Sequence, residues 1–80
     1  MTKDQIMRLT NSFFIEKLDF TPSQIYPDAE LRRDLGISSV DAVAIASFAQ
    51  KTFDCLIVMA EIKAIITLQD LYDYIEQHQR

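Results

Sequence analysis

The segment from Asp34 to Asp41 constrains the fold more than any other part of the chain, because it joins a turn signal to a helix start. It contains the only glycine, Gly36, which can adopt a positive φ and let the chain turn sharply. Ser38 is a good helix N-cap, because its hydroxyl can accept from a free backbone N–H of the first turn. Asp41 follows three residues later and favours a helix start through the dipole. A helix should therefore begin at Ser39, which would lie at its exposed start.

Hydrophobic periodicity predicts helices on both sides of this one, so the expected fold class is all-α. Thr2 and Gln5 form a capping-box pattern before a helix that should run from about Lys3 to Leu18. The helix that begins at Ser39 should continue to about Thr52, and the last helix should follow a cap at Thr67. We expect its end, residues 77–80, to fray.

The segments between these helices are predicted to be loops with short helical turns. Residues 19–38 form a long connection, in which a capping-box pattern around Pro22 indicates a single turn. Residues 54–59 have strand propensity but no matching partner strand, so we expect a loop with apolar anchors. A short helix is expected across residues 60–65. The chain is therefore predicted to be one domain, residues 1–80, folded as a small three-to-four-helix bundle with a long first loop.

Apolar stripes predict which residues face the core. On the first helix the stripe is Ile6, Leu9, Phe13, Phe14 and Leu18, and on the second it is Ala42, Ile45, Ala46, Ala49 and Phe53. The facing stripes should be buried together at Phe13, Ile45, Phe53, Leu71 and Ile75. The small alanines either leave room between helices for a ligand or allow close helix packing.

The second helix also carries apolar residues on another face, which includes Val40 and Val43. Two interpretations remain open for these valines. Either the helix is central and buried on two sides, or Val40 and Val43 form an exposed docking patch beside Ser39.

Composition limits the partners and the compartment. The formal net charge of −4 disfavours nucleic acid and anionic membranes as partners and leaves basic protein surfaces open. A single cysteine, Cys55, excludes an internal disulfide and suggests a reducing compartment. No signal peptide is evident, and the longest apolar run, Cys55 to Ala60, is too short to span a bilayer. We expect a cytoplasmic monomer.

The sequence offers little for catalysis. A nucleophilic serine needs an adjacent general base, and the only histidine is His78 near the C-terminus. No pair of His, Cys or carboxylate residues has convincing metal-ligand spacing. We therefore expect neither an enzyme nor a metal site.

The octet Asp34-Leu35-Gly36-Ile37-Ser38-Ser39-Val40-Asp41 resembles the Asp-Leu-Gly-x-Asp-Ser-Leu-Asp signature of acyl carrier proteins. In that family the serine at the position of Ser39 carries 4′-phosphopantetheine. The aspartate that precedes this serine in the family is Ser38 here. Acyl carrier proteins also have three principal helices and a long first loop, so the resemblance extends along nearly the whole chain.

The resemblance implies a carrier that holds an acyl intermediate as a thioester on phosphopantetheine at Ser39 and catalyses nothing itself. The pathway would be fatty-acid or specialised, polyketide-like biosynthesis. The implied partners are a phosphopantetheinyl transferase and acyl-loading and ketosynthase-type enzymes, which we expect to contact Asp34, Val40, Asp41 and Val43.

Two alternatives to this interpretation remain open. One is a small helical protein-interaction module with an unmodified Ser39. The other is an aminoacyl or peptidyl carrier, although those usually have Gly-Gly-His/Asp-Ser-Leu, which is absent here.

The sequence departs from the family in its charges. The family's second helix is usually rich in acids, whereas this one has Ala44, Gln50 and Lys51 where Glu commonly stands. Arg32 and Arg33 add positive charge before the octet. Because charge complementarity sets encounter rate and partner choice, we expect service in a dedicated pathway rather than housekeeping fatty-acid synthesis.

Overall fold

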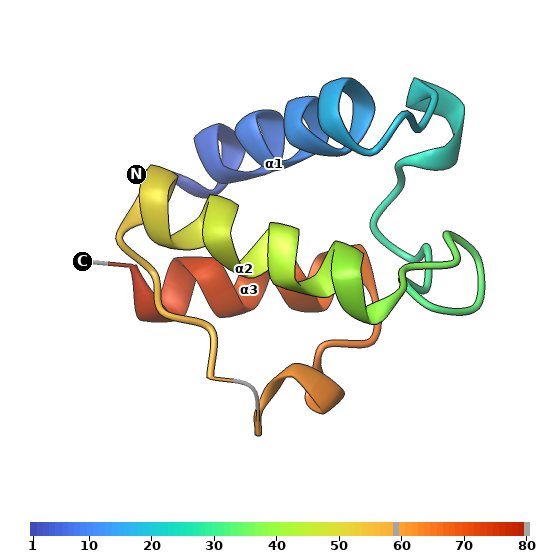
Figure 1. The fold of residues 1–80 in the computed structure, drawn as a ribbon. Coiled ribbons are helices and arrows are strands. Elements are labelled where there is room, and N and C mark those ends of the chain that lie inside the picture. Colours follow the sequence, from blue (N-terminus) through green and yellow to red (C-terminus); the bar gives the residue numbers. More distant parts are fainter. Residues whose placement is uncertain (59, 80) are drawn as a thin grey trace.

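The structure is a computed structural model that describes residues 1–58 and 60–79 of the chain. It contains the helices α1 (Lys3–Lys17), α2 (Ser39–Phe53) and α3 (Leu68–His78), with short 3₁₀ turns η1 (Pro22–Gln24) and η2 (Ile62–Ala64). No strand occurs in the described part, and the all-α prediction is confirmed. Figure 1 shows how α1, α2 and α3 pack side by side, with η2 at one edge of the bundle.

Each of the three α-helices begins with a capping box, as its sequence predicts. The pairs are Thr2 with Gln5, Ser38 with Asp41, and Thr67 with Asp70. In each pair the side chain of the first residue accepts from the backbone of the second, and the second side chain accepts from the backbone of the first. α2 runs one residue beyond the predicted end, to Phe53, before Asp54 turns the chain with a φ of 52°.

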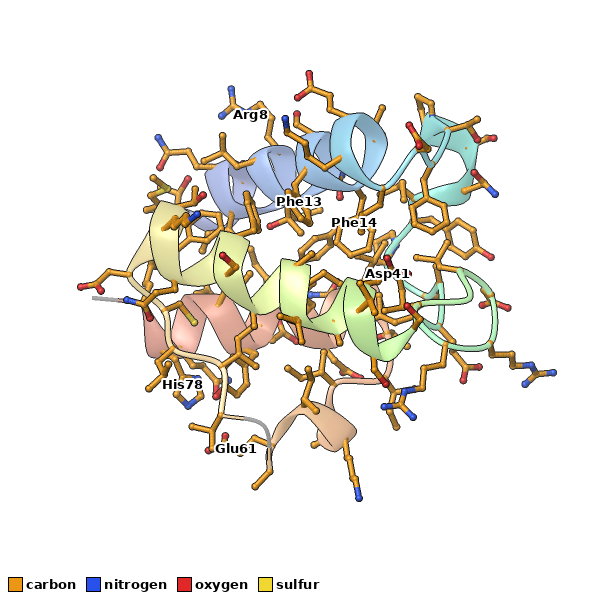
Figure 2. The ribbon with its side chains drawn as sticks, in the orientation of Figure 1. Arg8, Phe13, Phe14, Asp41, Glu61 and His78 are labelled. Atoms are coloured by element: carbon orange, nitrogen blue, oxygen red, sulfur yellow. The ribbon has the colours of Figure 1, made fainter. Side chains whose placement is uncertain are left out.

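Four of the five residues predicted to share the core are buried, namely Ile45, Phe53, Leu71 and Ile75. The fifth, Phe13, is only partly buried: it packs against this core and stacks on Phe48 with 4.4 Å between ring centroids. Its neighbour Phe14 is fully buried instead. Figure 2 shows both phenylalanines between α1 and α2.

The register of α1 explains this difference. Its buried residues are Ile6, Thr10 and Phe14, which recur every four positions. Because Thr10 is polar, the hydrophobic pattern points instead to Leu9, which is 38% exposed. The predicted α1 stripe is therefore wrong at Leu9.

The ends of the chain are held together, so the predicted fraying of residues 77–79 is also wrong. α3 continues to His78, and the Met1 ammonium donates to Gln79 Oε1 over 3.0 Å. Gln79 Nε2 donates in return to the Met1 carbonyl over 2.8 Å. The prediction for Arg80 lies outside the described residues.

Residues 54–58 form the predicted loop with apolar anchors, and Met59 lies outside the described residues. Cys55 and Ile57 are buried, whereas Asp54, Leu56 and Val58 point outward. Within residues 54–58, alternate side chains thus enter the core.

An ion pair between α1 and α3 should make the stability of the fold depend on pH in the acid range. Lys3 Nζ lies 2.5 Å from Asp73 Oδ1. The hydrogen bond from Lys3, helped by one from Gln69, lowers the pKa of Asp73 below its ordinary value. Because the folded pKa is depressed, the stabilisation is present above the unfolded pKa of about 3.9 and is lost as the pH falls through the folded value.

We therefore expect the unfolding free energy of the wild type to fall more steeply below about pH 4 than that of Asp73→Asn. Urea denaturation across this pH range measures the difference. Glu76→Gln is the matched control, because Glu76 is 3.7 Å from the same ammonium and only supplements the pair. Parallel curves for wild type and Asp73→Asn would contradict the assignment.

Candidate functional site

Three buried apolar side chains, Leu31, Leu35 and Ile37, anchor the loop before α2. The Leu31 N–H donates to the Ile66 carbonyl over 2.8 Å, which ties this loop to the segment before α3. Gly36 reverses the chain with a φ of 64°, and a Cβ added there would meet no atom within 4 Å. The glycine is therefore required for the backbone conformation and not for space, as predicted.

Asp34 closes the turn at the start of this loop. Its Oδ2 accepts from the Glu30 N–H over 2.9 Å, while the Asp34 N–H donates to the Glu30 carbonyl over the same distance. The side chain is exposed, so a partner can reach it. Its first role in this fold is nevertheless to fix the turn.

The start of α2 divides two roles between two adjacent serines. The Ser38 hydroxyl accepts from the Asp41 N–H over 3.3 Å, and Asp41 Oδ2 accepts from both the N–H and the hydroxyl of Ser38 over 3.2 Å. Ser39, the first residue of α2, is exposed, and its hydroxyl bonds to no residue that the structure describes. Ser38 therefore caps the helix and leaves the Ser39 hydroxyl available.

The two valines beside Ser39 are exposed. Val40 is 78% exposed and Val43 is 58% exposed, so the interpretation of α2 as buried on both sides is wrong. We call these two residues the valine patch. Asp41, which Figure 2 labels, lies between them in sequence. Its carboxylate is already engaged in the capping box.

A small apolar cavity of about 40 Å³ opens beneath the start of α2, with room for roughly three water-sized groups. Ala42 lines it, whereas Ala49 is fully buried in the core. One small side chain of the α2 stripe thus borders a cavity, and another allows close helix packing; whether the cavity takes a ligand stays a prediction. The wall on the far side is formed by Ile57, Ile62, Ile65 and Leu71, of which the predicted core stripes included Leu71.

No histidine or reactive thiol lies beside Ser39. His78 lies at the opposite end of the bundle from Asp41 in Figure 2, where it stacks on Tyr74. The only thiol belongs to Cys55, and burial raises its pKa. Among residues 1–58 and 60–79, no three His, Cys or carboxylate side chains are placed to hold a metal ion. The structure thus places no histidine beside Ser39 to act as the base of a nucleophilic serine.

Comparisons with known proteins bear directly on this arrangement. The family described as "Phosphopantetheine attachment site" matches residues 12–75, most of the chain. An acyl carrier protein of Cyanidioschyzon merolae is 36% identical over 80 residues, covering 100% of this chain and 88% of that protein. The chain belongs to the acyl carrier protein family. Its members are carriers and not enzymes, and their cofactor is phosphopantetheine.

Two more distant relatives agree with this assignment. The acyl carrier protein of Karelsulcia muelleri is 29% identical over 75 residues, covering 94% of this chain and 90% of that protein. That of Rubrobacter xylanophilus is 27% identical over 79 residues, covering 99% and 98%. A carrier of this family interacts with a phosphopantetheinyl transferase and with acyl-handling enzymes. No helix in the described part of this carrier is long and apolar enough to cross a membrane.

The start of α2 suits a phosphodiester. The first backbone N–H groups of a helix and its dipole favour negative charge. The capping box of Ser38 and Asp41 occupies only some of the free backbone N–H groups at this end of α2. Ser39, the first residue of this helix, is exposed to solvent.

Proposed function

We propose that Ser39 is the residue of this carrier that receives 4′-phosphopantetheine from coenzyme A. The terminal thiol of that group, once attached, holds an acyl chain as a thioester. The division of roles between Ser38 and Ser39 carries the proposal: one hydroxyl caps the helix and the adjacent one is exposed and bonds to no described residue.

The fold supports the proposal by giving the flexible arm a rigid base. Ser39 is the first residue of a helix of 15 residues, whose other end is fixed in the core by Phe53. The anchored loop before it limits movement of the helix start. The cavity lined by Ala42 lies beside Ser38, so it can shield the beginning of a carried chain.

The experiment is to incubate the purified protein with a broad-specificity phosphopantetheinyl transferase and coenzyme A and to measure the intact mass. A gain of one phosphopantetheine supports the carrier. No gain, under conditions that modify another acyl carrier protein, would favour an interaction module with unmodified Ser39.

We further propose that this carrier serves a dedicated pathway and not housekeeping fatty-acid synthesis. α2 contains a single acid, Asp41, whose carboxylate is engaged with Ser38. Its exposed face near Ser39 presents the valine patch instead. Recognition of α2 therefore depends more on apolar area than on negative charge.

This dependence predicts different effects for two neighbouring substitutions. Val43→Asp should slow phosphopantetheine transfer by about tenfold, because it places a charge where apolar area leaves water on docking. Asp41→Asn should slow it less, because the amide oxygen still accepts in the capping box. The measurement is kcat/KM for the transferase, with thermal melts to confirm that both variants fold. A larger loss in Asp41→Asn would show that charge dominates recognition.

A further inference from the structure

A second hollow lies beside the cavity at the start of α2. It is an open cleft of about 370 Å³ between the loop before α2 and the residues around η2. We call it the basic cleft; its lining residues are Glu30, Arg32, Arg33, Ile62, Lys63, Ile65 and Ile66. The hydrogen bond from the Leu31 N–H to the Ile66 carbonyl and the antiparallel bridge between Glu30 and Thr67 join its two sides. The cleft is therefore a built feature of the fold.

The charge of the cleft is opposite to that of the molecule. The chain has a net charge of −4, yet three cations and a single acid line this cleft. Arg33 lies 3.6 Å from Glu30 but is 81% exposed, so the pair is weak and easily exchanged for another partner. Among the described residues, no carboxylate lies within 4 Å of the charged groups of Arg32 or Lys63. The exposed rim of the cleft, formed by these three cations, can therefore bind an anionic group.

The floor of the cleft is apolar. Ile62 and Ile65 are partly buried beneath it, and Ile66 is 54% exposed. A small free anion would make no favourable contact with these isoleucines. A protein surface that presents carboxylates around an apolar side chain would match both the rim and the floor, as partner surfaces generally do.

The position of the cleft relates it to Ser39. Arg32, Ile62 and Ile65 line both the cleft and the small cavity, and Ser38 lines that cavity as well. In Figure 1 the loop before α2 and η2 flank the start of α2. A protein seated in the cleft would therefore lie next to the attachment residue.

We propose that the basic cleft is the docking surface for an acidic, partly apolar face of the enzyme that acts on the carried acyl group. The proposal rests on the function proposed for Ser39. This carrier would then dock through a basic surface, whereas members of its family usually present an acidic second helix. Such a contact excludes enzymes whose docking face is basic, because like charges repel, and admits those whose face is acidic.

The test uses the full chain carrying phosphopantetheine, labelled with ¹⁵N and titrated with two peptides. One is an amphipathic helical peptide of glutamate and leucine, and the other has lysine in place of each glutamate. We expect the glutamate peptide to shift the amide signals of residues 30–33 and 62–66 and the lysine peptide not to. Raising the salt concentration should weaken this binding, because the cations are exposed.

Charge reversal in the cleft provides the decisive comparison. Arg32→Glu/Lys63→Glu should bind the glutamate peptide at least about tenfold more weakly and should gain affinity for the lysine peptide. Lys51→Glu, an exposed reversal on α2, is the matched control and should leave binding unchanged. Thermal melts confirm that the variant is folded, and shifts confined to residues 30–33 and 62–66 assign the gain of the lysine peptide to the cleft.

Other outcomes would overturn the proposal. Equal shifts from both peptides would mean binding through apolar contact alone. Binding of pyrophosphate at the cleft as tight as that of the glutamate peptide would identify a small-anion site, and binding of vesicles rich in phosphatidylglycerol would identify a membrane surface. The intact mass of each variant after transferase treatment separates the two proposals: a normal mass gain with no peptide binding rejects the cleft and leaves the role of Ser39 intact.

Discussion

Ser39→Ala protein should gain no phosphopantetheine mass after incubation with a broad-specificity transferase and coenzyme A, whereas the wild type is converted. The substitution removes the hydroxyl at the exposed start of α2 that the capping box leaves unused. The methyl group of alanine cannot form a phosphodiester. Because the Ser39 side chain contributes no hydrogen bond to the cap, the variant should keep the stability of the wild type.

Two substitutions at Ser38 are the matched controls. Ser38→Ala removes the cap and should cost about 1 kcal/mol of stability. It should slow modification through loosening of the helix start, without abolishing it. Ser38→Asp should retain both stability and modification, since aspartate is as good an N-cap as serine. A mass gain in Ser39→Ala, or its complete loss in Ser38→Ala with Ser39 intact, would show that the attachment residue is wrongly assigned.

The helix starts were predictable because their determinants are local. Each capping box joins residues only three positions apart, so the sequence alone identifies Thr2, Ser38 and Thr67 as helix N-caps. The same locality made the roles of Ser38 and Gly36 readable in advance. The backbone conformation at Gly36 depends on its own φ and not on a distant neighbour.

Features that depend on tertiary contacts were harder to predict from the sequence. The core face of α1 includes Thr10, a polar residue that no hydrophobic pattern selects, and this moved the predicted stripe to Leu9. The expected fraying failed because Gln79 bonds to Met1, at the other end of the chain. In both cases the deciding partner lies on another element.

The candidate site shows the same division. The exposed serine followed from the capping pattern, whereas the sequence left open whether the valine patch was buried. The basic cleft was not predicted at all. Arg32 and Arg33 stood out as added positive charge, but Lys63 joins them only because Leu31 bonds to Ile66 and brings η2 to the loop.

Phe53→Ala should destabilise the protein more than any change at Ser38 or Ser39. Phe53 is 4% exposed at the end of α2, and its ring meets that of Phe48 edge-on with 5.5 Å between centroids. Truncating a buried phenylalanine costs about 3–5 kcal/mol, since apolar contact is lost and a cavity remains. That is comparable with much of the total stability of so small a domain.

The measurement is the thermal midpoint, followed by circular dichroism at neutral pH. A loss of this size should lower the midpoint by at least about 12 °C in a domain of this length. Leu56→Ala, three residues further on, removes a side chain that is 67% exposed and should change stability by no more than about 0.5 kcal/mol. If Phe53→Ala unfolds the protein completely, Phe53→Leu, which refills most of the space, should restore a cooperative transition below that of the wild type. Equal losses of stability in Phe53→Ala and Leu56→Ala would contradict the burial of Phe53 against Phe48. They would also contradict the position of the end of α2, from which the chain turns toward the cavity and the basic cleft.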